Sequence, residues 1–347
     1  METRRLKYID GIKGFAILFV VFYHLIWVCV KDKDSTIVPV FNSVCMQLFF
    51  FISGYVSCKG ISKMMTAKDV YKSIVRKGKA LLIPSVLMFF FCIWYFQQDL
   101  YGELMYEFKS GYWFTYVLFF IFLLHYIVVM TLRQITRFKG VRKFLLPMVL
   151  LFVFLASCHC WFPYRICEYF RILSLAFILK YYFFFLVGYL FSRYADRVNH
   201  ILNLSYTRYL IFILSFLFLL LPLTSTPPYF AALISLSQVV FVLCFFKDWE
   251  EQSRNSWLLN RLAYIGRHSM EIYFIHYYFM FGLPQLHDFI ESQDVLYIVR
   301  GPGSKAFVEL LTLLPISILL VYFSIFVRKL FDFAPQISTY LFGPIPR

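Results

Sequence analysis

Charged residues are scarce in this chain, and long polar segments are missing. Only 15% of the 347 residues are charged, whereas 61% are hydrophobic and 22% are aromatic. A water-soluble core of this size could not bury 44 Phe and 26 Tyr side chains, so a soluble globular protein is excluded. Because no polar stretch is long enough for a separate soluble domain, we expect residues 1–347 to form a single transmembrane unit.

The motifs of several enzyme classes are also absent. No P-loop, H-E-x-x-H, G-x-S-x-G or G-x-G-x-x-G pattern occurs, so phosphate-driven pumping, zinc proteolysis and nicotinamide chemistry have no support. The eight cysteines form no C-x-x-C pair, and their only cluster is Cys158-His159-Cys160 with Cys167 nearby. We expect unpaired cysteines and no metal site, while a disulfide in this cluster stays open.

Ten apolar segments approach the length of about 20 residues that a membrane-spanning helix needs. They are residues 12–30, 38–57, 80–96, 113–131, 144–161, 172–191, 207–223, 229–246, 262–283 and 306–328. Loops on the side of the N-terminus hold 26 Lys and Arg residues, and loops on the other side hold 7. This positive-inside asymmetry predicts an all-α polytopic membrane protein with about ten transmembrane helices and both termini cytoplasmic. The same asymmetry accounts for the net charge of +15. We therefore expect contact with membrane lipid and no binding of nucleic acid.

The first apolar segment carries two ionisable side chains that are candidates for a site. Lys13 and His24 are eleven residues apart, which places them on one helix face with a rise of about 16 Å between them. Lys13 would lie at the cytoplasmic end and His24 in the outward half. Ionisable groups at such depths are costly and are functional candidates. The alternative is that Lys13 is a topology signal and His24 an interfacial hydrogen-bonding residue.

A second group of polar residues enters the segment 262–283. Ser269, Glu271, Tyr273 and His276 fall within it, and His276 should lie at a depth comparable to His24. Two histidines on different helices could form a general-base or acyl-carrying site. The alternative is a set of structural hydrogen bonds between helices.

Basic and aromatic residues outside these two segments supply weaker signals. The loop 59–79 holds seven basic residues and ends in 76–79 (RKGK), which suits the phosphates of a nucleotide-like donor, although topology or anionic lipid explains it too. Trp113 opens an apolar segment, as an aromatic belt residue or a substrate platform. Lys180 is an intramembrane charge for which Glu271 is a conceivable partner. The Ser-Gly pair in 49–55 (FFFISGY) favours close helix packing, and His125 reads as a hydrogen-bonded core histidine.

Four stretches, taken in order, carry a resemblance. They are 9–14 (IDGIKG) followed by His24, 49–55 (FFFISGY), 76–84 (RKGKALLIP) and 265–276 (IGRHSMEIYFIH), with Trp113-Phe114 as a weaker fifth. Together they resemble the signatures of the integral-membrane acyltransferase family 3, which includes bacterial O-acetyltransferases of surface polysaccharides. Lys13 and Lys79 stand where many members carry arginine. Lysine keeps the positive charge but lacks the two-pronged hydrogen bonding of the guanidinium group.

The resemblance implies an acyltransferase of the bacterial plasma (inner) membrane. It would move an acyl group, usually acetyl, from cytoplasmic acyl-CoA to a hydroxyl of a cell-surface or lipid-linked glycan, with no tightly bound cofactor. His24 would deprotonate the acceptor or carry the acyl group briefly, and His276 and Tyr273 would orient His24 or help bind the acceptor. The donor phosphates would bind Lys13, Arg76 and Lys79. Candidate substrate-binding residues are Trp113, Asp10, Ser269 and Glu271.

Three properties and one competing function stay open at this point. The acceptor glycan, the length of the acyl chain and the oligomeric state have no readable signal in the sequence. A transporter or flippase for a lipid-linked glycan would use similar intramembrane polar groups. Against it, the chain shows no inverted repeat and no matching pair of Gly/Pro-broken helices.

Overall fold

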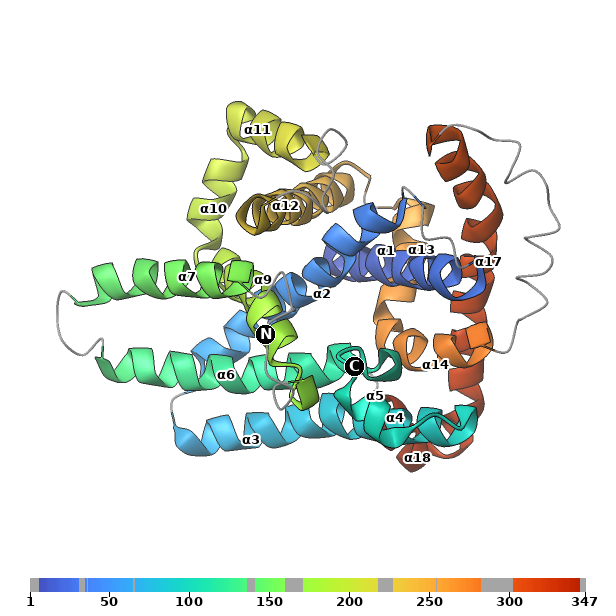
Figure 1. Ribbon diagram of the computed structural model, residues 1–347. Coiled ribbons are helices and arrows are strands. Elements are labelled where there is room, and N and C mark those ends of the chain that lie inside the picture. The colour runs from blue at the N-terminus through green and yellow to red at the C-terminus, as the bar shows by residue number, and fades with distance from the viewer. Residues whose placement is uncertain are drawn as a thin grey trace.

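The computed structural model describes residues 6–30, 35, 37–64, 66–135, 141–159, 171–217, 227–253, 255–281 and 302–343. Every regular element in these ranges is helical (Figure 1). The elements are α1 (Lys7–His24), η1 (Leu25–Val30), α2 (Ile37–Ser62), α3 (Ala67–Lys77), η2 (Gly78–Leu82), α4 (Ile83–Phe96), α5 (Leu100–Met105), η3 (Lys109–Gly111), α6 (Trp113–Ile135), α7 (Val141–His159), α9 (Leu175–Arg193), α10 (Ala195–Leu202), α11 (Ser205–Phe216), α12 (Pro228–Gln252), α13 (Trp257–Arg267), α14 (Ser269–Phe281), α17 (Pro302–Leu330), η6 (Phe331–Phe333) and α18 (Pro335–Phe342).

The all-helical prediction is confirmed, and membrane-length helices are present. Within the described residues, seven helical stretches are long and apolar enough to cross a bilayer: Lys7–Trp27, Val38–Ser62, Ala67–Phe96, Trp113–Gln134, Leu175–Arg193, Pro228–Gln252 and Glu309–Phe333. The predicted segment 144–161 contains a shorter apolar helix, Met148–Cys158. The segment 207–223 contains α11, and its last residues lie outside the described part of the chain. The count of ten spans therefore stays a prediction.

One predicted span has a different form. Residues 262–283 were expected as a single helix, but the helix breaks at His268 into α13 and α14. The His268 amide bonds to the carbonyl of Ile265, three residues back, and this tighter turn ends α13. Gly and Ser at 266 and 269 flank the break, a pairing at which helices often kink. On either side of the break, α13 and α14 both contact α1.

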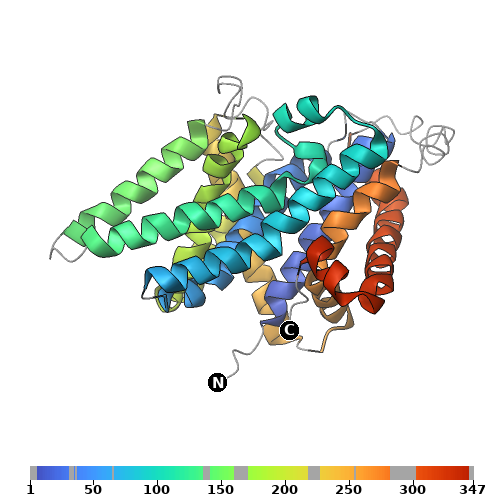
Figure 2. The same ribbon diagram turned by 90° about the horizontal axis from the view of Figure 1, so that it is seen from below.

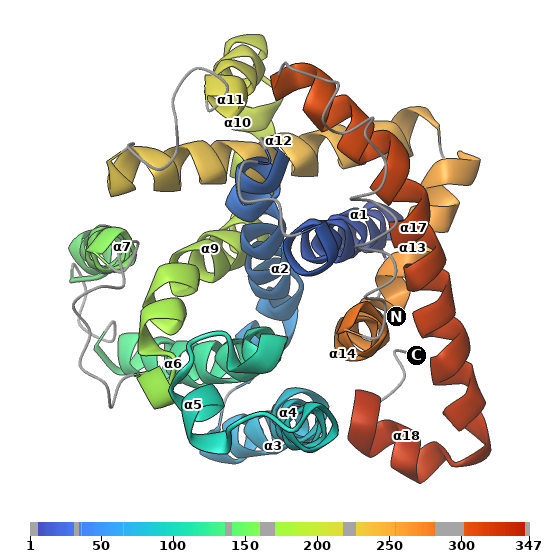
Figure 3. The same cartoon turned by 45° about the vertical axis from the view of Figure 1, so that its right-hand side comes forward.

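The helices pack around α1 and α2 through glycines at two crossings. Figure 3 shows α1 near the centre, with α2 on one side and α13, α14 and α17 on the other. A Cβ on Gly14 would lie 1.9 Å from the Leu262 carbonyl oxygen, so α1 and α13 approach closely only because no side chain is present there. Gly54 of α2 meets the Phe185 carbonyl of α9 in the same way, at 2.0 Å. The predicted close packing of the Ser-Gly pair is confirmed.

Both ends of the described chain lie at one end of the bundle. Gly343, after α18, lies against the backbone of Ala80 in η2, just beyond Lys77. Lys77 and Lys13 line one cavity close to the start of α1. In Figure 2 the start of α1 (dark blue) and α18 (red) both lie in the lower half of the view. We call the end with Lys13 and Lys77 the basic end, and the opposite end of α1, with His24, the histidine end. The cytoplasmic location of the termini stays a prediction.

Candidate active site

A hydrogen-bonded chain of side chains links α1 to α14 at the histidine end. His276 Nδ1 lies 2.8 Å from the Ile272 carbonyl oxygen, and its Nε2 lies 3.1 Å from Nδ1 of His24. On the far side of the His24 ring, Nε2 lies 2.7 Å from the hydroxyl of Tyr277. His276 is fully buried, whereas His24 keeps partial exposure. The two histidines that the sequence singled out are therefore in direct contact.

The hydrogen-bond partners of His276 and His24 determine which ring nitrogens carry protons when both imidazoles are neutral. A backbone carbonyl can only accept, so Nδ1 of His276 carries the proton and Nε2 of His276 accepts. Nδ1 of His24 must then donate to His276, which leaves Nε2 of His24 as a lone-pair acceptor for the Tyr277 hydroxyl. A histidine whose tautomer is fixed by a second group in this way presents one basic nitrogen in a defined direction. That atom is Nε2 of His24.

Tyr273 holds the neighbouring backbone rather than His24. Its hydroxyl donates to the Gly111 carbonyl at 2.8 Å and accepts from the Phe114 amide at 3.1 Å. Gly111 has a φ of +90°, and a Cβ there would lie 2.3 Å from the ring of Tyr277. The bare Gly111 thus lets Tyr277 reach His24, and Tyr273 fixes Gly111. The predicted catalytic role of Tyr273 stays a prediction, and its geometry is that of a positioning residue.

The loop that carries Gly111 is strained and fixed by a buried lysine. Lys109 and Ser110 have φ values of 48° and 50°, which non-glycine residues rarely adopt. The Lys109 ammonium donates to the carbonyl oxygens of Leu104 at 2.5 Å, Tyr106 at 3.3 Å and Arg171 at 3.0 Å. Such strain persists only where the surroundings over-determine the backbone, and it concentrates at functional sites.

The burial of Lys109 predicts a pH dependence of stability. Burial lowers the pKa of Lys109 to about 8, although the carboxylates of Glu107 and Glu103 oppose the shift. Between pH 8 and about 10 the unfolded chain keeps this proton and the folded protein releases it, so stability rises with pH in that window. We expect a gain on the order of 1–3 kcal/mol between pH 7 and pH 10. Thermal unfolding of the wild type and of Lys109→Met across this range measures it, and an equal pH response of both proteins would contradict it.

A cavity of about 190 Å³ runs along α1 on the Lys13 side. Its walls are mainly apolar, with Lys13 and Lys77 as its only charged lining residues among those described. From α1 it is lined by Lys13, Ile17 and Val20, which lie on the helix face that leads to His24 one turn later. Ser269 and Tyr273 of α14 also line it. Two cations at one end of an apolar cavity, with a histidine beyond the other end, suit a molecule with an anionic head and a slender tail.

The basic residues predicted for the donor are only partly brought together. Lys13 lines the cavity and lies 3.7 Å from the carboxylate of Asp10. Arg76 and Lys79 are exposed and do not line it. Lys77, which was not predicted to bind the donor, lines the cavity instead. Its ammonium lies 3.9 Å from the ring centre of Phe122. Ser73 and Leu81, four residues on either side of Lys77, are buried, but the π-helical turn η2 begins between Lys77 and Leu81, so residue spacing alone gave no signal for the inward face of Lys77.

The remaining predicted substrate residues lie in different surroundings. Asp10 is buried beside Lys13 at the basic end, and Ser269 lines the cavity. Trp113 is buried against Phe177, with ring centres 4.6 Å apart, so it belongs to the aromatic core. Glu271 is buried 3.5 Å from His268, which replaces the conceivable pairing with Lys180. Roles for these residues in substrate binding stay predictions.

Two histidine and cysteine expectations have different outcomes. His125 is buried and hydrogen-bonds the hydroxyl of Tyr182 at 3.3 Å, so the expected core histidine is confirmed. Cys158 is a buried free thiol, whereas Cys160 and Cys167 lie outside the described residues, as does any pairing between them. Within the described ranges, no group of three His, Cys, Asp or Glu side chains could hold a metal ion.

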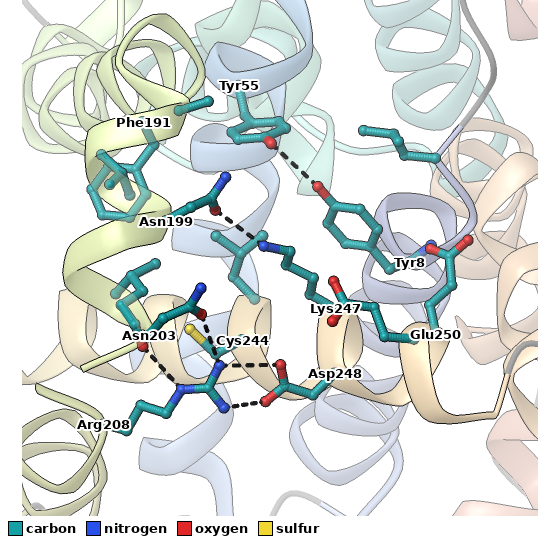
Figure 4. Close-up of a pocket in the computed structure, with 16 residues that line it drawn as sticks. Tyr8, Tyr55, Phe191, Asn199, Asn203, Arg208, Cys244, Lys247, Asp248 and Glu250 are labelled. Atoms are coloured by element: carbon teal, nitrogen blue, oxygen red, sulfur yellow. Dashed lines mark hydrogen bonds and ion pairs between the residues drawn. The ribbon is translucent and has the colours of Figure 1, made fainter. Parts of the chain in front are cut away.

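A larger cavity, of about 570 Å³, lies beside the start of α1 (Figure 4). Its polar side chains bind one another: Arg208 pairs with Asp248 at 2.6 Å, Lys247 donates to Asn199, and Tyr8 contacts Tyr55. Three carboxylates, from Asp248, Glu250 and Glu251, oppose its two cations. An anionic ligand therefore fits this cavity less well than the one with Lys13 and Lys77, and its network joins α1 to α10, α11 and α12.

The chain was compared with known proteins by sequence and by structure. Residues 6–329 match a family model described as an acyltransferase domain. No curated protein and no solved structure matches the chain. The match takes in the Lys13 cavity, both histidines and Tyr277. Because it covers nearly the whole chain, the protein belongs to the integral-membrane acyltransferase family 3.

Proposed function

We propose that this membrane acyltransferase moves an acyl group, acetyl in the first instance, from acyl-CoA to a hydroxyl group of a glycan. The carrying observation is the arrangement along α1. The cavity holds Lys13 and Lys77 and is lined by the α1 face that carries Lys13, Ile17 and Val20. His24, whose Nε2 is the basic nitrogen, follows Val20 by one helical turn. The donor would enter from the cytoplasm and the acceptor from the outer face of a bacterial plasma membrane.

The donor is assigned to the Lys13–Lys77 cavity on the basis of charge and shape. CoA phosphates are bound well by lysine ammonium groups, and no carboxylate among the described residues lines this cavity. The apolar walls would accept the pantetheine arm and bring the thioester toward His24. Asp10 beside Lys13 would hold that lysine in place when the site is empty.

The chemical step uses the proton arrangement of the histidine pair. The acceptor hydroxyl would replace the Tyr277 hydroxyl at Nε2 of His24, and Nε2 would take its proton as the oxygen attacks the thioester carbonyl. The C–S bond breaks, the new ester forms, and the proton passes from Nε2 to the departing CoA thiolate. His276 would stabilise the transient imidazolium by accepting from Nδ1 of His24. In the variant route, Nε2 attacks the thioester carbonyl and the C–S bond breaks to release the CoA thiolate; the acceptor hydroxyl then takes the acyl group from Nε2, and its proton passes by way of the freed Nε2 to the thiolate.

Transfer of label from radioactive acetyl-CoA tests the proposed function. Purified protein in lipid nanodiscs is incubated with isolated surface glycan and the donor, and label in the glycan is counted. Incorporation supports the enzyme, and label retained by protein denatured at neutral pH, in the wild type but not in His24→Ala, would select the acyl-histidine route. A protein that moves glycan across the bilayer without incorporating label would be a transporter instead.

Lysine variants test where the donor phosphates bind. Lys77→Gln is expected to raise the KM for acetyl-CoA by about tenfold with little change in kcat, because it removes a cation that faces the cavity. Lys79→Gln is the matched control on the exposed side of the same helical stretch, and we expect less than a threefold effect. Equal effects of both variants would place the phosphates outside the cavity.

A further inference from the structure

An aromatic surface extends from His24 to an exposed position at the histidine end. Trp27, one turn beyond His24 in η1, is 54% exposed. Its ring stacks on that of Tyr23, with centres 6.4 Å apart and planes at 18°. The Tyr23 ring in turn meets His24 edge-on at 5.1 Å. Two stacked rings therefore lead from an exposed position to the imidazole that carries the basic nitrogen.

The helix geometry at this point favours a built surface over a chance one. α1 changes to the π-helix η1 at Leu25, directly after His24. A π-helical turn is rare and widens the spacing between side chains, and such turns are frequent at functional sites. Here the wider turn starts between Tyr23 and Trp27, so it sets how these two rings align beside His24.

Among the described residues, the other exposed tryptophans, Trp94 and Trp257, have no ring contact with His24 or Tyr23. Trp94 of α4 is 66% exposed, but its ring partner is Phe91, at 5.7 Å and 32°. A tryptophan of this kind fits the aromatic belt at a membrane surface. Trp27 differs because its stacking partner contacts the proposed base.

The chemistry of this surface matches a sugar ring. One face of a pyranose presents C–H groups and packs on an aromatic ring as other apolar surfaces do, while its hydroxyls project from the edge toward polar partners. A pyranose ring packed on the exposed Trp27 would lie about one helical turn from His24. Simple alcohols offer a hydroxyl but no flat face for such a surface to recognise.

We propose that the Trp27–Tyr23 stack binds the pyranose ring of the acceptor and presents one of its hydroxyls to Nε2 of His24. This inference rests on the proposed function for its catalytic consequence, although the binding itself does not. Trp27 acts as a specificity residue that holds the sugar, and the proton transfer remains with His24.

Acetyl transfer and sugar binding are measured together with Trp27→Ala, Trp27→Phe and the control Trp94→Ala. The acceptors are methyl pyranosides of glucose, galactose, mannose and N-acetylglucosamine, with glycerol as the acyclic comparison, and binding is followed by isothermal titration calorimetry. For the best pyranoside, Trp27→Ala is expected to weaken binding and raise the acceptor KM about tenfold, with the KM for acetyl-CoA and transfer to glycerol unchanged. Trp27→Phe should recover most of the loss, and Trp94→Ala should match the wild type.

The outcomes separate this inference from the proposed function. Transfer to pyranosides that is equal in the wild type and Trp27→Ala overturns the sugar surface and leaves the enzyme intact. A wild type that transfers no acetyl but loses pyranoside binding on Trp27→Ala overturns the proposed chemistry and supports the surface. Equal pyranoside binding by the wild type and by Trp27→Ala overturns the proposed sugar surface, whether or not the wild type transfers acetyl.

Discussion

Replacing His24 by alanine is expected to lower the rate of acetyl transfer by about 10³-fold while the protein still folds. The variant removes the one nitrogen to which the acceptor proton could pass, since the geometry directs Nε2 of His24 away from His276. Label transfer from acetyl-CoA to glycan measures the rate, and size-exclusion chromatography of the purified variant checks folding. The KM for acetyl-CoA should stay near its normal value, because the Lys13–Lys77 end of the cavity is unchanged.

His125→Gln is the matched control for His24→Ala. His125 is also a buried histidine in a membrane-length helix, but it hydrogen-bonds the hydroxyl of Tyr182 and lies far from His24 in the sequence. We expect its rate to stay within about threefold of the wild type, a small change beside the effect of a lost general base. A folded His24→Ala protein that transfers acetyl at more than a tenth of the normal rate would remove His24 from the chemical step.

Gly54→Ala is expected to destabilise the protein by about 3 kcal/mol or more, at the upper end of overpacking costs. The added Cβ would lie 2.0 Å from the Phe185 carbonyl oxygen, and a carbonyl inside a helix cannot rotate away. α2 and α9 would have to separate along their crossing, where a Cβ added at Gly188 would likewise lie 2.0 Å from the Phe51 carbonyl oxygen. Since helix association in membranes relies on such close packing, the loss should be large.

Gly60→Ala supplies the comparison within the same helix. Nothing lies within 4 Å of a Cβ at Gly60, so the alanine should be neutral or stabilise by about 0.5–1 kcal/mol through helix propensity. Thermal unfolding in detergent, followed by size-exclusion chromatography, gives both midpoints. Equal midpoints for the two variants would show that α2 and α9 do not pack as closely as the structure has them.

Residue spacing predicted much of the candidate site because helices repeat regularly. The eleven-residue interval between Lys13 and His24 and the approximate depth of His276 both follow from helical rise, and the two histidines do meet. The same rule went wrong where the helix is irregular. The turn at His268 divides the predicted span 262–283, and η1 and η2 interrupt α-helical periodicity next to His24 and Lys79. The sequence predicted Tyr273 and Lys79 for the site, whereas the structure places Tyr277 beside His24 and Lys77 in the cavity. Residue spacing could not specify which of these neighbouring side chains faces the site.

The sequence alone determined that this is an all-helical membrane protein, with its basic residues segregated and its histidines in apolar helices, because hydropathy and charge act locally along the chain. The family also followed from short motifs in a fixed order. Only the tertiary structure decided which nitrogen of His24 is basic, which lysine faces the cavity and which aromatic rings lead to the histidine. These properties depend on contacts between helices far apart in sequence, made possible by glycines at their crossings.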